Sequence, residues 1–221
     1  MRVATKTASA GVVPWTIAIV LIAAAVAAQN PPPAQPATNQ PPAQPTQPGR
    51  GGRGGGRGAI QVMALTTTAW TDGGMIPKKH TQAGEEMSPA FTWSNVPDGI
   101  QSFVLIAHDL DAAIGNGTDT ILHWMLWNIP GTSRSLPEGV AAVPQLPDGT
   151  RQISASGPYY RGPGAPASGP PHHYAFELYA LDAPINVPAV GQSPALTRAA
   201  VVSAMATHVR GKAVYVGLFK R

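Results

Sequence analysis

Histidine, aspartate and tyrosine side chains collect at the ends of three apolar segments of this 221-residue sequence. Imidazole, carboxylate and phenol groups can together bind an anion, transfer protons or ligate a metal ion. Taken singly, each also fits a structural polar group that caps a turn or pairs with the backbone. Taken together they indicate a site, because apolar folds seldom concentrate such groups at one edge unless something binds there. The residues are His108, Asp109, Asp111, His123, His172, His173 and Tyr174.

Four segments of the sequence have the length of strands and are rich in Val, Ile, Leu and aromatic residues. The polar residues lie in or directly beside the first three. The first two are apolar on both faces, which is typical of central strands covered on each side. If the first three strands are neighbours, two His, one or two Asp and a Tyr meet at one end of a sheet. The segments span residues 102–108, 120–129, 172–181 and 212–219.

The alternation of side chains along 172–181 separates its polar residues. A strand directs successive side chains to opposite faces. His172 and Tyr174 therefore share one face, and His173 points away from them.

One good helix is predicted near the end of the chain, over residues 193–211. Ser193 suits the N-cap, Pro194 suits the first turn, and Gly211 is the expected stop. Since the other elements are strands, the sequence predicts a mainly β fold, a β-sandwich with a late helix.

Charge divides the chain into two parts. The first 58 residues contain five of the 15 Lys and Arg and no acid, so the remainder holds 15 − 5 = 10 basic residues against 11 acidic ones, a formal charge of −1. A nucleic-acid footprint would lie on the domain surface, so this balance argues against a specific nucleic-acid partner.

The N-terminal part predicts export. Residues 1–28 have a short basic start, an apolar stretch and a small-residue end, the layout of a signal peptide, with cleavage before Gln29. A membrane anchor formed by residues 12–28 is the alternative. Residues 29–58, rich in Pro and Gln and then in Gly and Arg, predict a disordered linker. The folded domain is expected over 59–221, and with no cysteine it must be stable without a disulfide.

Several ordered blocks resemble the phosphatidylethanolamine-binding protein (PEBP) family, in particular its bacterial Raf-kinase-inhibitor-like branch. The resemblance covers about residues 63–221, nearly all of the expected domain. The blocks lie at 65–112, 123–130 ("HWMLWNIP"), 135–139 ("SLPEG"), 159–166 ("YYRGPGAP"), 172–182 ("HHYAFELYALD") and 204–221.

The resemblance implies a β-sandwich with a small anion pocket at one end, which in relatives accepts phosphate-like groups, carboxylates or phospholipid headgroups. The family's Asp-Pro-Asp-Ala-Pro segment falls on residues 109–113. Carried over position by position, the ligand-binding set is Asp109, His123, Gly164, His172 and Tyr174.

This sequence departs from the family pattern around the pocket. Leu110 and Ala113 replace both prolines of the first segment, so a less rigid turn is expected there. Ala165 loosens the second loop in the same way. His173 stands where Arg is usual, and Gln82 stands where many bacterial members have Cys.

These features predict an exported, non-enzymatic binding protein with no cofactor, as a monomer or homodimer in the periplasm or outside the cell. Its ligand would be a small anion, a phospholipid headgroup or an anionic group on a partner, and some relatives inhibit kinases or proteases. Within the pocket, Asp109 is expected to accept a hydrogen bond from one N–H of a His and keep that His a donor. A backbone N–H beside Gly164 and the Tyr174 hydroxyl are further expected donors.

Two alternatives remain from the residues themselves. A hydrolytic enzyme could use the His and Asp groups as acid and base, although no Gly-x-Ser-x-Gly nucleophile motif is present. A metal site could use His108, Asp109, His123 and His172 as ligands.

Overall fold

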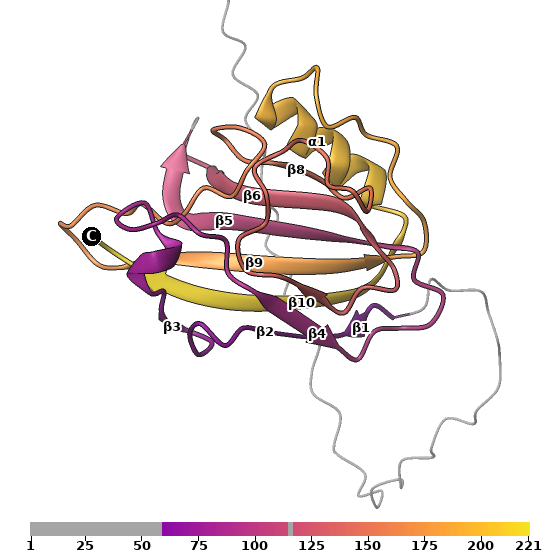
Figure 1. The fold of residues 1–221 in the computed structure, drawn as a ribbon, viewed down its shortest axis with the longest axis horizontal. Coiled ribbons are helices and arrows are strands. Elements are labelled where there is room, and N and C mark those ends of the chain that lie inside the picture. The colour runs from indigo at the N-terminus through magenta and orange to yellow at the C-terminus, as the bar shows by residue number, and fades with distance from the viewer. Residues whose placement is uncertain (1–58, 115–116) are drawn as a thin grey trace, which may run out of the picture. The chain divides into compact units, whose positions relative to one another are not determined.

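The computed structural model describes residues 59–114 and 117–221 (Figure 1). The expected signal peptide or anchor (1–28) and the expected linker (29–58) lie outside the described residues. The elements are β1 Gln61–Val62, β2 Ala64–Thr66, β3 Gly74–Met75, the 3-10 turn η1 Lys78–His80, β4 Phe91–Ser94, β5 Ser102–Ile114, β6 Asp119–Pro130, β7 Ser135–Leu136, β8 Arg151–Ile153, β9 His172–Leu181, α1 Pro194–Met205 and β10 Val209–Phe219.

A seven-stranded sheet forms the centre of the domain, in the order β1-β10-β9-β5-β6-β8, with β3 also paired to β10. The four strands predicted from the sequence are its four long strands, and they lie side by side (Figure 1). Neighbours among them are antiparallel. The mainly β fold and the adjacency of the three polar-ended strands are confirmed.

A second, three-stranded sheet, β2-β4-β7, packs on one face of the large sheet. Phe91 and Trp93 of β4 are buried in one core cluster with Phe103 and Leu105 of β5. This face-to-face packing makes the domain a β-sandwich.

The opposite face of the large sheet packs against α1. Val201 and Met205 of the helix are buried in a second cluster with Val104 and Ile106 of β5. Strand β5 therefore contributes alternate side chains to two cores, which is why its residues 103–107 are all apolar.

Helix α1 begins as predicted and ends earlier than predicted. Ser193 is the N-cap, since its hydroxyl accepts a hydrogen bond from the Leu196 N–H at 3.4 Å, and Pro194 occupies the first turn. The expected stop at Gly211 is wrong. The helix ends at Met205, and Gly211 pairs with Ala180 inside β10, because pairing with β9 extends that strand back to Val209.

No helix over 59–114 and 117–221 is long and apolar enough to cross a membrane.

Candidate functional site

A cavity of about 230 Å³ lies where β5, β6 and β9 meet the loop that precedes β9. All five residues predicted for the pocket line it. Further members of the lining come from the loop and from a segment about 80 residues earlier in the chain. The lining consists of Gln82, Asp109, Ala112, Ile121, His123, Arg161, Gly164, Ala165, Pro166, His172 and Tyr174.

Asp109 is held rigidly despite the missing prolines. Its Oδ1 accepts hydrogen bonds from the N–H groups of Asp111 (3.0 Å) and Ala112 (3.1 Å). A carboxylate that bonds the backbone two and three residues ahead fixes a turn much as proline would. The expected loosening of the turn is therefore offset by the Asp109 side chain itself.

The remaining Asp109 oxygen orients His172. Oδ2 lies 2.9 Å from His172 Nδ1, and Asp109 is only 3% exposed. Because a carboxylate can only accept, Nδ1 carries a proton, and the other ring nitrogen, Nε2, is the one not committed to Asp109. The register pairs Asp109 with Tyr174, which brings these two strand ends together. Nε2 is an acceptor in the neutral ring and a donor in the doubly protonated ring.

His123 is held in a different state. Its Nδ1 donates to the carbonyl oxygen of Arg161 at 2.8 Å, and the Arg161 N–H donates to the His123 carbonyl at 2.9 Å. Burial lowers the pKa of His123, since desolvation disfavours the charged ring. With Nδ1 protonated, the neutral ring presents Nε2 as an acceptor.

Tyr174 fixes the loop opposite β6. Its Oη accepts hydrogen bonds from the N–H groups of Gly164 (3.2 Å) and Ala165 (3.1 Å). Burial, with the charge of Asp109, raises the pKa of Tyr174, so the phenol stays neutral. The next residue, Pro166, has no N–H. These bonds commit the Gly164 and Ala165 N–H groups to Tyr174, whereas the sequence led us to expect a backbone donor for the ligand.

Gln82 and Arg161 also line the cavity, and neither was predicted. Gln82 Nε2 donates to the Gly162 carbonyl at 2.8 Å, and Gln82 Oε1 accepts from Arg161 Nη2 at 3.5 Å. A Cβ on Gly164 would overlap the Gln82 side chain, which explains the glycine there. Arg161 belongs to the block "YYRGPGAP", next to the loop expected at the pocket. This position is the feature of the sequence that could have identified Arg161 as a pocket residue.

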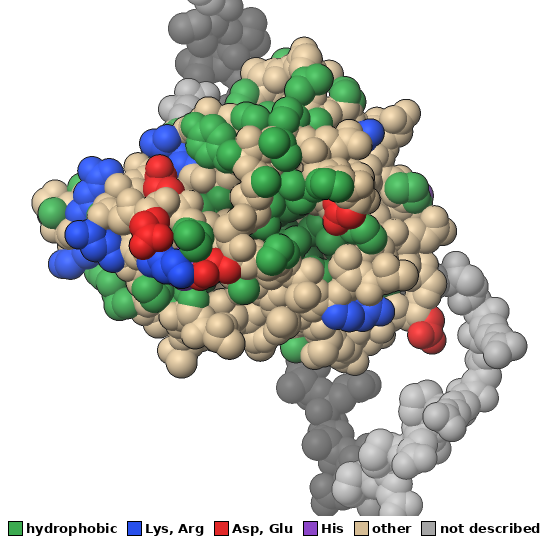
Figure 2. All heavy atoms as spheres, in the orientation of Figure 1, with side chains coloured by type: hydrophobic (Ala, Val, Ile, Leu, Met, Phe, Trp, Pro, Cys, Tyr) green, Lys and Arg blue, Asp and Glu red, His purple; other side chains and the backbone are tan. Residues whose placement is uncertain are grey.

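Arg161 supplies a positive charge to the cavity. Its Nη1 donates to Ser156 Oγ at 2.6 Å. Among the described residues, no carboxylate lies within 4.0 Å of its guanidinium. Figure 2 shows Lys and Arg side chains gathered at the end of the molecule where η1 and the C-terminus lie in Figure 1, with Asp and Glu among them. Exposed pairs such as Lys79 with Glu138 (2.8 Å) balance one another there.

The proposed metal ligands do not come together. His108 lies on the other face of β5 and contacts Glu177 and Thr120, away from Asp109, His123 and His172. No group of three or more His, Asp or Glu in the part of the chain that the structure describes could hold a metal ion. The predicted set of four metal ligands is therefore wrong, because His108 and Asp109 are consecutive residues of a strand and face opposite sides.

Asp111 and His173 form a separate pair outside the cavity. Asp111 Oδ2 lies 2.8 Å from His173 Nδ1 and 2.6 Å from the His173 backbone nitrogen. Both side chains are about half exposed, and the two hydrogen bonds lower the pKa of Asp111. The prediction that His173 points away from His172 is confirmed.

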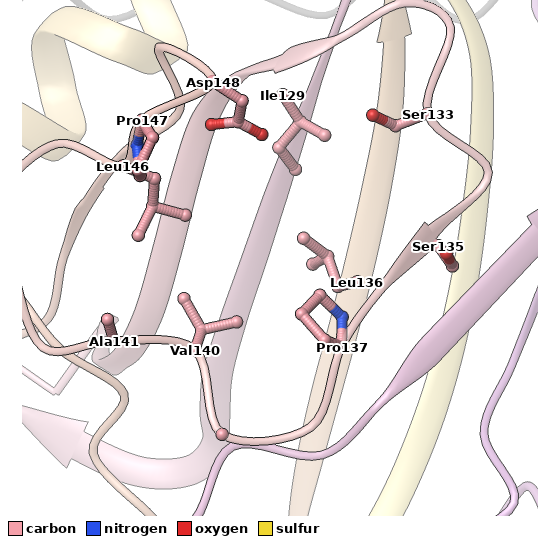
Figure 3. A pocket seen from close by; sticks show the side chains of 11 residues that line it. Ile129, Ser133, Ser135, Leu136, Pro137, Val140, Ala141, Leu146, Pro147 and Asp148 are labelled. Carbon is pink, nitrogen blue, oxygen red and sulfur yellow. The ribbon is translucent and has the colours of Figure 1, made fainter.

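A larger cavity, of about 310 Å³, lies beside the loop between β7 and β8 (Figure 3). Figure 3 shows Leu136, Val140 and Leu146 directed into it, with the Asp148 carboxylate at one end. This lining has one titratable side chain and no basic group. It offers no set of groups that could bind an anion or transfer a proton.

The domain that carries this cavity has counterparts among known proteins. A family model described as phosphatidylethanolamine-binding protein matches residues 66–220. The chain belongs to this family. A UPF0098 protein of Methanothermobacter thermautotrophicus is 40% identical over 161 residues, which cover 72% of this chain and 99% of that protein.

Solved PEBP structures share the fold. Escherichia coli YbcL, described as a new member of the mammalian PEBP family, is 26% identical, with a TM-score of 0.60, and the match covers 72% of this chain and 98% of that one.

A sequence relative from Mycobacterium tuberculosis, LppC, is named as a candidate lipoprotein. It is 30% identical over 164 residues, which cover 73% of this chain and 74% of LppC.

Proposed function

We propose that this PEBP-family protein binds a small anion bearing a phosphate group in the cavity on β5, β6 and β9. The carrying observation is that Arg161 and His172 line the same cavity, with the buried Asp109 behind the His172 ring. In the proposed complex Arg161 supplies charge, and His172, bound in its doubly protonated form, supplies a directed donor at Nε2. Charge-assisted hydrogen bonds of this kind are about twice as strong as neutral ones.

The hydrogen bonds of Asp109 favour a simple phosphate over a zwitterionic headgroup. Three of roughly four acceptor positions on the Asp109 carboxylate are taken, by two backbone N–H groups and His172, and the residue is 3% exposed. An ammonium group would have little of this carboxylate to contact. The ethanolamine part of a headgroup therefore gains nothing from Asp109.

His123 favours a ligand oxygen that carries a proton. Because its Nδ1 donates to the Arg161 carbonyl, the neutral ring offers an acceptor to the cavity. A phosphate monoanion has two unprotonated oxygens, which share its charge, for Arg161 and His172, and an O–H for His123. Inorganic phosphate or a phosphomonoester matches this set of donors and acceptors.

Hydrolysis finds less support from the cavity. The described lining contains no Ser, Thr or Cys that could act as a nucleophile. The non-enzymatic interpretation therefore stays the proposal.

Export belongs to the same proposal. Residues 1–28 have the composition of a signal peptide, residues 12–28 suit an anchor, and 29–58 suit a spacer ahead of a domain at 59–221. The name of the relative LppC supports attachment to an envelope. Fractionation of cells that express the full chain tests this directly, and recovery in the cytosol alone would contradict export.

Calorimetric titration of the full chain with inorganic phosphate tests the binding proposal. His172→Ala should remove saturable binding, whereas His173→Ala, the adjacent residue on the other face, should leave it unchanged. Phosphoethanolamine should bind no tighter than ethyl phosphate. No heat of binding in the wild-type protein, or equal loss in both variants, would reject the proposal.

A further inference from the structure

A second site lies on the opposite face of the large sheet, between α1 and the paired ends of β5 and β6. The cavity there has a volume of about 620 Å³. Its described lining includes Leu122 of β6 and Ala195, Ala199 and Val202 of α1, so its walls are mostly apolar. Cavities of this size with apolar walls and a few placed polar groups are typical of small-molecule sites.

The polar end of this cavity is built around Arg198. Its Nη1 donates to the Thr120 carbonyl at 3.1 Å and its Nη2 to Thr120 Oγ1 at 3.1 Å, and Nη2 also lies 3.5 Å from His108 Nδ1. These contacts hold the guanidinium of Arg198 between α1 and the residues Thr120 and His108 of the sheet. No described residue accepts a hydrogen bond from Nε, so donors remain for a ligand.

The charges around Arg198 leave it unbalanced. Glu177 contacts His108 Nε2 at 3.3 Å and is already paired with Lys212 at 2.6 Å. The contacts with His108 and Lys212 lower the pKa of Glu177 to about 2. Asp119 lines the exposed rim of the cavity, yet it forms no ion pair with Arg198 within 4.0 Å. A half-buried cation thus faces an apolar space with no described carboxylate as its partner.

We propose that this cavity binds a small apolar molecule that bears one carboxylate, with the carboxylate on Arg198 and the apolar body against α1. A guanidinium and a carboxylate match in geometry as well as charge. Burial of the ligand's methylene groups against the apolar wall adds to its affinity. This site is separate from the phosphate cavity, because His108 and Asp109 project to opposite faces of β5.

Octanoate is the probe, titrated into the full chain by calorimetry. Octanol and octylammonium are the controls, since they keep the apolar body and change the charge. Octanoate should bind saturably and at least ten-fold more tightly than either control. Equal binding of octanol would reduce the cavity to an apolar crevice and overturn the proposal, as would no saturable binding of octanoate.

Variants locate the carboxylate. Arg198→Gln should weaken octanoate at least ten-fold. Because this change also removes bonds to Thr120, a second pair tests the charge at an exposed position, Val202, which is 45% exposed. Val202→Asp should weaken octanoate at least ten-fold by repulsion, whereas the matched Val202→Asn should weaken it clearly less. His172→Ala should leave octanoate binding unchanged, and octanoate binding lost in His172→Ala but kept in Val202→Asp would place the carboxylate in the other cavity and overturn the proposal.

Discussion

Replacing Asp109 by Asn is expected to weaken phosphate binding by roughly 30-fold. In the proposed complex, a doubly protonated His172 donates one hydrogen bond from Nδ1 to the Asp109 carboxylate, at 2.9 Å, and one from Nε2 to the ligand. An amide carries no charge, so we expect the variant to bind phosphate without the imidazolium. Two opposing effects follow, because Asp109 supports the imidazolium and also repels the anion.

Distance decides which effect is larger. The anion oxygen lies beyond the 2.9 Å hydrogen bond, the imidazole ring and a second hydrogen bond, roughly 7 Å from the carboxylate. At an effective dielectric constant of about 20, the repulsion over this distance is roughly 2.4 kcal/mol, and the attraction of an imidazolium about 4 Å away is roughly 4 kcal/mol. The net loss is about 2 kcal/mol, or roughly 30-fold in affinity.

Asp111→Asn is the matched control. It makes the same change two residues along β5 and breaks the same kind of pair, Asp111 with His173, outside the cavity. Phosphate titration calorimetry at pH 7 should show the loss in Asp109→Asn alone. Unchanged or tighter binding in Asp109→Asn would mean that repulsion dominates and that His172 does not act as a charged donor.

Further predictions concern the other groups of the phosphate cavity. Arg161→Gln should weaken phosphate at least ten-fold in the same titration, because it removes the cation. Tyr174→Phe should lower the free energy of unfolding by about 1–3 kcal/mol in urea, because it removes the acceptor of two N–H groups; Tyr159→Phe, at a 36% exposed residue, should cost less. Burial lowers the pKa of His123 in the folded state. As the pH falls, His123 is therefore protonated in the unfolded chain before it is protonated in the folded chain. The free energy of unfolding should therefore fall as pH drops below about 6.5, and His123→Gln should reduce this slope in urea titrations at several pH values; an unchanged slope would contradict a neutral His123.

The long strands could be predicted because their residues repeat one physical signal over many positions. Residues 172–181 were expected as a strand and form β9 with the same bounds. Strands of two or three residues, such as β1 and β7, have no such signal, since their pairing with β10 and β4 depends on partners distant in the sequence. Gly211 was misassigned for a related reason, because strand pairing outweighed its local preference as a helix stop.

The candidate site shows the same division. The strand residues Asp109, His172 and Tyr174 could be placed together from alternation and from the family resemblance. Gln82 and Arg161 could not, because they reach the cavity from loops whose course is set by contacts about 80 residues apart. The hydrogen bonds from the Gly164 and Ala165 N–H groups to Tyr174 could not be predicted from the sequence either, since they depend on the position of the loop before β9.

The uninterrupted pairing of β5 with β9 limits where single residues can be inserted or deleted in this protein. Registers run without a shift from Ser102 opposite Leu181 to Asp109 opposite Tyr174. Inserting or deleting one residue within this stretch would turn the Asp109 carboxylate toward α1 and the His108 ring toward the phosphate cavity. The gain or loss of a single codon would then damage both cavities at once, whereas the loop between β7 and β8, which lines neither cavity, should accept insertions. Libraries of single-codon deletions should therefore be depleted across 102–109 and not across that loop.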